Sequence, residues 1–320
     1  MNPFTEDPTQ SVGALGERRL IAKLREWLGA ATPRAPFGIG DDCAVLPPTG
    51  SRRVLVTTDP VIYGRHFDDS ISAAAAAEKL LKRNLSDIAA MGGTPRAAVV
   101  SLALPRRVSI AWIREFYRAL GRCARRHQVA IAGGDIAESA DMLGAFLTLF
   151  GEADGKRVLT RQGARAGDRI YVSGELGGSI LGKHHRFTPR LAEGRWLAGR
   201  AEVRCLMDLS DGLAKDLLEL TPPGLKPALD ARALPLSRAA YQLARRDGRP
   251  AIDHALSDGE DFELLFALRA GADTAAFERA WRARFATRLT CVGKFARVAD
   301  TTVGAIPLER YHGYEHLAGA

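Results

Sequence analysis

The sequence has few cysteines, and none of them lie close together. Cys43, Cys123, Cys205 and Cys291 are scattered, without a Cys-x-x-Cys pair. This spacing excludes a zinc knuckle and a dithiol redox motif. Scattered cysteines in a long chain are typical of reduced thiols in the cytosol, so we expect a cytoplasmic protein.

Long apolar runs are missing as well. No segment has the roughly 20 consecutive apolar residues that a membrane-spanning helix requires. Residues 1–10 are polar and acidic, and they lack the apolar centre of a signal peptide. We therefore expect no membrane partner.

The chain is basic, but it has no basic stripe interleaved with aromatic residues. Its formal net charge is +8 and its pI is near 9.6. The densest basic cluster, 118–126, has the pattern of the solvated face of a helix. Because single-stranded nucleic acids are bound by basic grooves with stacking aromatic side chains, the sequence favours a scattered basic surface and no nucleic-acid partner.

Length and element order indicate two domains. The 320 residues exceed the size at which a single core usually stops growing. Strand-like and helix-like segments occur in both halves, which predicts an α/β or α+β class. A stretch rich in Gly and Arg at 151–167 is interpreted as a linker. We therefore predict one domain over 1–151 and a second over 152–320.

Periodicity and capping residues predict the main elements. Helices are expected over 17–29, 72–91, 109–127, 190–197, 208–220, 237–246 and 274–285. Strands are expected over 53–59, 97–104, 129–132, 142–150 and 168–173, around 228, and over 262–268 and 289–295. Ser72 and Ser109 stand where N-caps are favoured, and Gly92-Gly93 follows its helix as a stop signal.

The sequence is rich in acidic residues set beside Gly, Ser and Thr at the ends of apolar runs. The segments are Gly38-Ile-Gly-Asp-Asp42, Thr57-Thr-Asp59, Asn84-Leu-Ser-Asp87, Gly133-Gly-Asp135, Asp208-Leu-Ser-Asp-Gly212 and Asp258-Gly-Glu-Asp261. Carboxylates converge only where positive charge holds them, and hard divalent cations accept such oxygen ligands. Because Mg²⁺ is also the ion with which proteins bind nucleotide phosphates, the pattern predicts Mg²⁺-dependent phosphoryl chemistry.

Each segment alone also has an ordinary structural interpretation. Asp87 follows Asn84 by three residues at the edge of an apolar stripe, where a solvated flank is slightly favoured over a carboxylate aimed into a cleft. Thr57-Thr58-Asp59 ends a strand with either metal ligands or turn formers. Gly133-Gly134-Asp135 follows a strand and permits either close approach to a ligand or a turn. Several segments of the same chemical type are harder to explain as ordinary turns than any one segment alone.

Three further features have two interpretations each. In Asp208–Gly212, Ser210 or Asp211 is either only a helix cap or part of a helix start whose free N–H groups bind phosphate. Gly177–His184 nearly matches a P-loop, but His replaces the Mg²⁺-binding hydroxyl, so we interpret it as a Gly-rich loop. His66 is either a structural residue or a substrate contact.

Taken in order, the segments resemble the thiamine-monophosphate kinases, a family of the PurM-like (aminoimidazole ribonucleotide synthetase) superfamily. The matching stretches are 38–44, 57–59, 64–67, 84–95, 133–135, 159–161, 172–174, 208–213, 259–264 and 292–293. They span nearly the whole chain. Their combination is specific, although no single stretch is. Asn84-Leu-Ser-Asp87 and Gly259-Glu-Asp-Phe262 point most clearly at this family.

The resemblance implies transfer of a phosphoryl group from ATP to thiamine monophosphate, which gives thiamine diphosphate. It implies a two-domain PurM-like fold whose N-terminal halves pair in a homodimer, with active sites near the interface. It implies several Mg²⁺ ions, bound by Asp42, Thr57, Thr58, Asp59, Asp87, Asp135, Asp208 and Asp211. It implies nucleotide contacts from Tyr117, Gly134, Asp135, Arg161 and Ser210, and substrate contacts from His66, Glu260 and Tyr311.

This chemistry needs no protein nucleophile. The acceptor is a phosphate oxygen, and because the second pKa of a phosphate monoester is about 6, it is largely ionised at neutral pH. The obstacle is repulsion between two anions, which Mg²⁺ and Arg161 can neutralise. We expect direct in-line transfer by positioning and electrostatics.

Departures from the family pattern lie on the substrate side. The segment between Gly178 and His185 is short, Asp258 stands where Gly is usual, and Tyr311 stands where an aromatic residue, often Trp, stacks on the substrate. The alternatives are another PurM-like enzyme that uses ATP, of the aminoimidazole ribonucleotide synthetase or selenophosphate synthetase type, or a non-catalytic nucleotide-binding paralogue. Cys43 is interpreted as buried, which disfavours the selenophosphate type.

Overall fold

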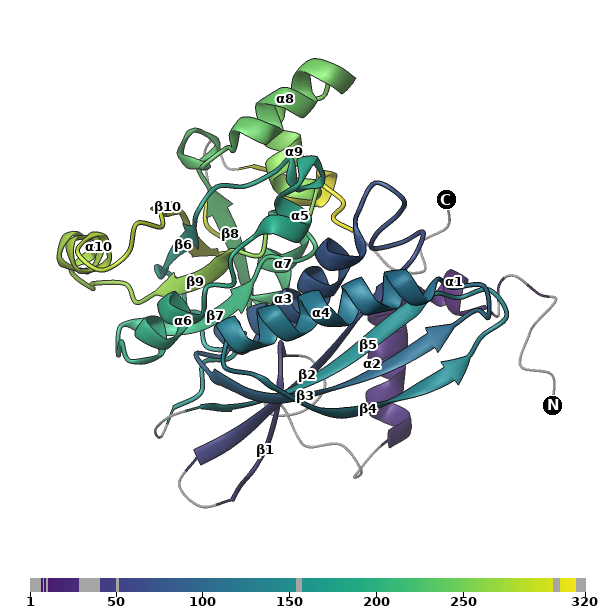
Figure 1. Cartoon of the computed structure of the whole chain (residues 1–320). Helices are drawn as coiled ribbons and strands as arrows, with labels where there is room; N and C mark the ends of the chain where they lie inside the picture. The colour runs from purple at the N-terminus through teal and green to yellow at the C-terminus, as the bar shows by residue number, and fades with distance from the viewer. Residues whose placement is uncertain are drawn as a thin grey trace.

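The computed structural model describes residues 7, 9, 11–28, 41–49, 52–153, 157–301 and 306–314. Within these residues the chain forms a mixed α/β fold with two five-stranded sheets (Figure 1). Gly29, expected to end a helix, and 38–40, the start of the first acidic segment, lie outside the described residues. No helix in the described part of the chain is long and apolar enough to cross a bilayer.

The first sheet is built from the N-terminal half of the chain, in the order β1-β2-β5-β3-β4. Its strands are β1 (Ala44–Thr49), β2 (Arg52–Ile62), β3 (Thr94–Leu104), β4 (Ala130–Glu138) and β5 (Gly144–Ala153). Neighbouring strands are antiparallel except β3 and β4, which are parallel. Strand β4 stands last in the strand order, so it forms one edge of this sheet.

Helices α3 (Ala73–Ala90) and α4 (Ile110–Arg126) pack together over the first sheet (Figure 1). The predicted caps are confirmed, because the Ser72 hydroxyl accepts the Ala75 N–H and the Ser109 hydroxyl accepts the Ala111 N–H. Helix α3 is apolar on several sides and lies between the two sheets, where it contacts β2, β5 and β7. It is therefore the element that both halves of the chain share.

The second sheet has the order β7-β9-β6-β10-β8 and is antiparallel throughout. Its strands are β6 (Arg169–Ser173), β7 (Val203–Asp208), β8 (Leu225–Leu229), β9 (Leu264–Leu268) and β10 (Leu289–Arg297). Strand β9 is buried on both faces. Leu264, Phe266 and Leu268 join the core that contains α3, whereas Leu265 and Ala267 join a second core. A continuous apolar strand is the expected sequence for this position.

The remaining helices surround the second sheet or lie near the N-terminus. They are α1 (Val12–Leu15), α2 (Glu17–Leu28), α5 (Lys183–Arg186), α6 (Leu191–Ala198), α7 (Leu213–Glu219), α8 (Arg238–Asp247), α9 (Ala251–Ser257) and α10 (Thr274–Arg282). Short 3₁₀ turns cover Ser179–Leu181, Ala231–Ala233 and Leu308–Arg310. Helices α6 and α10 pack in the core that contains α3, and α7 and α9 pack in the second core.

The C-terminal ends of two strands, β4 and β5, were misplaced in the sequence analysis. Strand β4 was expected to be buried and to stop before Gly133-Gly134-Asp135, but it is exposed and continues through them, because it pairs with β3 along its whole length. A Cβ at Gly134 would lie 1.8 Å from the Val100 carbonyl oxygen. The close approach that Gly134 permits is therefore to a neighbouring strand. Similarly, 151–153 belong to β5 and not to a linker.

The second half contains elements that the sequence patterns missed. Strand β7 ends at Asp208, which was expected to open a helix, and helix α7 begins only at Leu213. Helix α9 was not expected at all. Strand β7 has six residues and helix α9 has seven, and both are too short for hydrophobic periodicity to define them.

The crossing of α6 over α3 depends on a glycine and can be tested. A Cβ at Gly194 would lie 2.0 Å from the carbonyl oxygen of Ala89. Gly194→Ala should therefore lower the free energy of unfolding by about 1–3 kcal/mol, because overpacking outweighs the usual gain from Ala in a helix. Urea denaturation measures this change.

The matched control is Gly199→Ala. Its added Cβ would meet nothing closer than 3.5 Å, and the backbone φ at Gly199 is −77°. This variant should unfold like the parent protein. Equal stability of the Gly194 variant would contradict the close helix crossing.

Candidate active site

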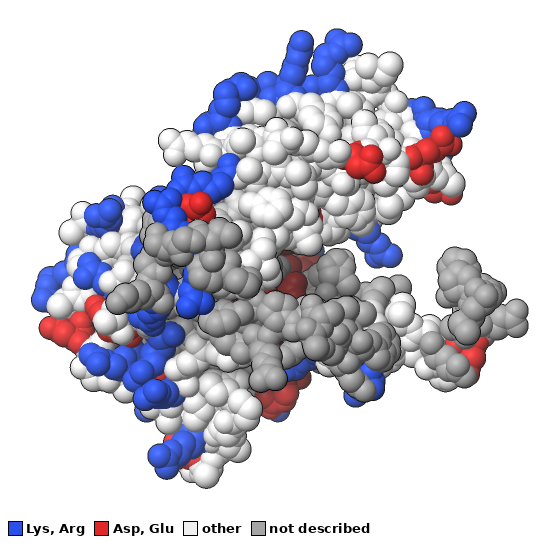
Figure 2. Space-filling view, turned by 90° about the horizontal axis from the view of Figure 1, so that it is seen from below, with Lys and Arg blue, Asp and Glu red and all other residues white. Residues whose placement is uncertain are grey.

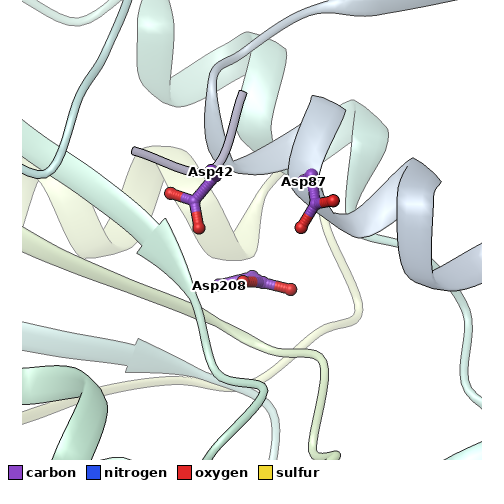
Figure 3. A group of neighbouring side chains, drawn as sticks. All are labelled: Asp42, Asp87 and Asp208. Atoms are coloured by element: carbon purple, nitrogen blue, oxygen red, sulfur yellow. The ribbon is translucent and has the colours of Figure 1, made fainter. Parts of the chain in front are cut away.

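Three aspartates from distant parts of the chain converge between the two sheets. Asp42, Asp87 and Asp208 each place a carboxylate oxygen within 4.8 Å of the others (Figure 3). Asp42 lies two residues before β1, Asp87 is on α3, and Asp208 is the last residue of β7. The cluster therefore forms only when α3 brings the two sheets together.

Neighbouring hydroxyl groups orient two of these carboxylates. Thr57 on β2 donates its hydroxyl proton to Asp87 Oδ2 at 2.5 Å, and Ser86 donates to Asp208 Oδ2 at 2.6 Å. Ser86 and Asp87 are adjacent on α3, so they point to different neighbours. The two bonds fix the carboxylates relative to the helix.

The three carboxylates repel one another strongly in this buried position. Burial, and then the nearby Asp42 carboxylate, raises the pKa of Asp208 to about 8. Burial also raises the pKa of Asp87 well above its ordinary value, with further contributions from Asp59 and Asp208. Asp41, which the sequence analysis did not select, has its pKa raised to about 7 by burial and by Asp42.

Arg161 provides only part of the positive charge that this cluster needs. It donates to Asp42 Oδ1 at 2.8 Å, and its backbone N–H donates to Asp41. The second oxygen, Asp42 Oδ2, is buried and has no hydrogen-bond partner among the described residues. A buried carboxylate oxygen without a donor is costly. Hard oxygen ligands with such an unpaired oxygen fit a Mg²⁺ ion.

A cavity of about 520 Å³ opens above the cluster. The predicted residues that line it are Asp42, Thr57, Thr58, Asp59, His66, Asp87, Arg161, Asp208, Ser210, Asp211 and Glu260. The lining also contains residues that the sequence analysis did not assign to the site: Asp41, Arg65, Arg83, Ile180, Asp258, Phe262 and Tyr314. The cavity is acidic at the aspartate cluster and extends towards His66 and Glu260.

A buried lysine connects the two sides of the cavity at its His66 and Glu260 end. Lys79 on α3 is fully buried and ion-pairs with Glu260 at 2.7 Å. Its ammonium group also donates to the His66 carbonyl oxygen at 2.9 Å. Burial lowers the pKa of Lys79, and the Glu260 carboxylate opposes this change. The sequence held a signal for Lys79, because it lies eight residues before Asp87 on the same helix face.

Comparison with known proteins gives consistent results along the chain. A family model described as AIR synthase related protein, N-terminal domain, matches residues 40–153. A thiamine-monophosphate kinase of Rhodopirellula baltica is 39% identical over 243 residues, which cover 73% of this chain and 76% of the relative. A thiamine-monophosphate kinase of Salmonella typhimurium is 33% identical over 334 aligned residues, which cover 95% of this chain and 99% of the relative.

The chain belongs to the thiamine-monophosphate kinase family. A solved structure described as "AaThiL complexed with AMPPCP and TMP" matches it with a TM-score of 0.82 and 28% identity. That match covers 97% of this chain and all of the other. The PurM-like fold predicted from the sequence is therefore confirmed.

The thiamine-monophosphate kinase motif around Asp208 forms a turn that a further aspartate closes. Asp216 Oδ2 accepts the backbone N–H groups of Ser210, Asp211 and Gly212, at 3.0–3.2 Å. Two sequence interpretations were therefore wrong. Neither Ser210 nor Asp211 caps α7, whose N-cap is Gly212. The N–H groups are also not free for a phosphate, because Asp216 occupies them.

The Gly-rich loop of this family member likewise binds carboxylates. The Gly177 N–H donates to both oxygens of Asp261 at 3.1 Å, and the Gly178 N–H donates to Asp258 at 2.8 Å. Asp258 also pairs with His254 at 3.0 Å. The departure at Asp258 from the thiamine-monophosphate kinase pattern thus has a structural account, since this carboxylate fixes the loop that borders the cavity.

Some residues predicted from the thiamine-monophosphate kinase pattern do not line the cavity. Gly134 and Asp135 lie on the exposed edge strand β4, and Tyr117 is partly exposed on α4. Tyr311 packs against the second core, whereas Tyr314 lines the cavity and donates its N–H to the Asp211 carbonyl oxygen. Tyr314, and not Tyr311, is therefore the tyrosine that lines this cavity among the described residues.

The charge of the cluster predicts a pH-dependent stability. Asp208 keeps its proton up to a pKa of about 8 in the folded protein, against an ordinary value of 3.8. The folded protein therefore binds more protons than the unfolded protein between these values. Its free energy of unfolding without metal should fall as the pH rises from about 4 through about 8. Asp208→Asn should raise that free energy at pH 8, by on the order of 1–3 kcal/mol.

Thermal unfolding with and without Mg²⁺ measures this effect. Mg²⁺ should raise the Tm of the parent protein at pH 8, and the rise should shrink in the Asp208 variant. The control is Asp141→Asn, whose side chain is 89% exposed. An Asp208 variant that is no more stable than the parent at pH 8 would show that the carboxylates do not repel one another as described.

Proposed function

We propose that this protein transfers the γ-phosphoryl group of ATP to thiamine monophosphate, in a Mg²⁺-dependent step of thiamine diphosphate biosynthesis. The observation that carries the proposal is the Asp42, Asp87 and Asp208 cluster at the base of a cavity, in a chain of this family. The related structure, described as complexed with AMPPCP and TMP, supports it, since AMPPCP is an analogue of ATP.

The carboxylate cluster would hold the metal. Asp42, Asp87 and Asp208 would be the central ligands, and Asp59, Asp211 and the Thr57 and Thr58 hydroxyls lie around the same cavity. When bound, Mg²⁺ supplies positive charge that lets two phosphate groups approach each other. The repulsion that the cluster stores without metal is then relieved, which couples metal binding to the stability of the site.

The residues of this chain would act by binding and positioning. Arg161 and Ser210 would contact the nucleotide, and His66 and Glu260 would contact the acceptor. Lys79 holds the Glu260 carboxylate in place, and Tyr314 offers an aromatic ring at the cavity. The acceptor phosphate oxygen attacks the γ-phosphorus directly, without a general base, because it is already ionised near neutral pH.

The buried position of Cys43 disfavours an alternative reaction. Its side chain is 1% exposed. Burial and the surrounding aspartates raise the pKa of this thiol well above its ordinary value. A reactive thiolate requires the opposite environment, so the selenophosphate synthetase type of chemistry is not supported.

We also infer a homodimer in which strand β4 faces a second copy. This edge strand is exposed along its length, and Ile136 is 68% exposed. Gly134 and Asp135 lie on this strand, away from the cavity of their own chain. A partner could therefore receive Asp135, and Tyr117 from the adjoining α4, at its own active site. We further propose two domains whose boundary lies near residue 152, at the end of β5, whose last residue is Ala153, and a cytoplasmic location.

The kinase activity has a direct test. Purified protein incubated with ATP, Mg²⁺ and thiamine monophosphate should produce thiamine diphosphate, which is separated by chromatography. Asp87→Asn should lower kcat by at least about 10²-fold, because it removes a metal ligand, while the fold stays intact by circular dichroism. Asp141→Asn should remain fully active. Absence of thiamine diphosphate with the parent protein would end the assignment.

Complementation between two inactive variants tests the dimer. If Asp135 serves the partner's cavity, mixing Asp87→Asn with Asp135→Asn restores one intact site in each mixed dimer. Random mixing should then recover up to about a quarter of the parent activity, because half of the dimers are mixed and each has one intact site. Each variant alone should stay inactive. No recovery after subunit exchange, verified by labelled subunits, would place Asp135 outside the partner's site.

A further inference from the structure

Arg83 is a half-buried cation that lines the cavity. It lies on α3, and only 12% of its side chain is exposed. One guanidinium nitrogen donates to the Pro60 carbonyl oxygen at 3.0 Å, and another donates to Asp59 Oδ1 at 3.3 Å. The third nitrogen, Nε, is buried and has no partner among the described residues. Nε has almost no accessible surface, so donors for a ligand in the cavity that Arg83 lines would come from the two terminal nitrogens, each of which makes one of these bonds.

The position of Arg83 along α3 relates it to both ends of the cavity. Lys79, Arg83 and Asp87 are spaced by four residues, so they share one helix face, and each step advances by about 6 Å. Asp87 belongs to the metal-binding cluster, and Lys79 ion-pairs with Glu260. Arg83 therefore lies midway between the predicted metal end and the predicted acceptor end.

The charges around the cavity distinguish Arg83 from Arg161. Arg161 Nε is likewise buried without a partner among the described residues, so the two arginines differ in their carboxylate contacts. Arg161 donates to Asp42 Oδ1 at 2.8 Å. The contact of Arg83 with Asp59 is longer, at 3.3 Å. If Asp59 binds a divalent cation, the metal takes over the neutralisation of this carboxylate. The guanidinium group is then a positive charge that is available to an anion in the cavity.

We propose that Arg83 binds the phosphate group of the acceptor substrate and fixes its position relative to the Asp42, Asp87 and Asp208 cluster. This inference rests on the proposed kinase function. Guanidinium groups bind phosphate oxygens through paired, charge-assisted hydrogen bonds, which fix both distance and orientation. Arg83 is thus a substrate-binding residue, whereas Lys79 acts through Glu260 and is a positioning residue.

The reaction does not require a proton from Arg83. An acceptor phosphate oxygen forms a bond to the γ-phosphorus of ATP, and the bond from this phosphorus to its bridging oxygen breaks. ADP leaves with the electron pair. Arg83 keeps its proton and its charge throughout, and it offsets the repulsion between the two phosphates before the bond forms.

The alternative is that Arg83 only clamps β2 through Asp59 and Pro60. This structural role would affect all ligands of the acceptor pocket alike. A phosphate-binding role affects only ligands that carry the phosphate. The ratio of the affinities for thiamine monophosphate and for unphosphorylated thiamine separates the two roles, and it does not depend on the fraction of correctly folded protein.

The experiment measures this ratio by isothermal titration calorimetry, with Mg²⁺ present and without nucleotide. Arg83→Gln should weaken thiamine monophosphate binding by about 10–100-fold, which corresponds to the loss of charged hydrogen bonds, and should leave thiamine binding within about two-fold. Arg83→Lys should recover part of the loss, because it keeps the charge without the paired donors. Arg245→Gln, an exposed arginine on α8, should change neither affinity.

Steady-state kinetics provides a second measurement. In Arg83→Lys the KM for thiamine monophosphate should rise, while the KM for ATP should stay within about two-fold of the parent value. Equal losses for thiamine and thiamine monophosphate, or no loss for either, would overturn the role of Arg83. A parent protein that binds neither ligand and makes no thiamine diphosphate would overturn the proposed function together with this inference.

Discussion

The repulsion among buried carboxylates is the constraint on which the rest of this structure depends. Asp42, Asp87 and Asp208 bring oxygen atoms within 4.8 Å of one another, and Asp42 and Asp208 are buried. Such an arrangement is unfavourable unless a cation is present. The fold imposes it through rigid elements, since hydroxyl groups on β2 and α3 orient two of the carboxylates. The fold itself therefore places the three carboxylates together.

Helix α3 links this constraint to the architecture (Figure 1). It packs between the two sheets and presents charged residues to the cavity on one face, while much of the rest of its surface is apolar and buried. A buried helix would ordinarily exclude Lys and Arg. Here Lys79 and Arg83 are tolerated because each meets a carboxylate from another element. Charged groups along this helix therefore connect the predicted metal end with the predicted acceptor end.

The surface shows a different use of charge. Figure 2 shows Lys and Arg side chains in separate groups on the drawn face, and not in one continuous stripe. This distribution agrees with a basic chain whose excess charge is dispersed. The acidic residues that matter for the proposed chemistry line the cavity instead. The positive net charge therefore reflects the outer surface of this protein. It does not describe the cavity, whose lining is rich in acidic residues.

Sequence patterns predicted many of the local elements and the acidic character of the site. Ser72 and Ser109 defined helix starts because capping is a local interaction, and the repeated aspartates indicated a divalent cation. The roles of Asp216 and Arg83 depend on neighbours in space. Strand β4 continued beyond its expected end because β3 supplied its hydrogen bonds. The packing of the C-terminal segment places Tyr314 at the cavity and Tyr311 against the second core. Tertiary structure alone decided these points, since burial and pairing arise only when distant segments meet.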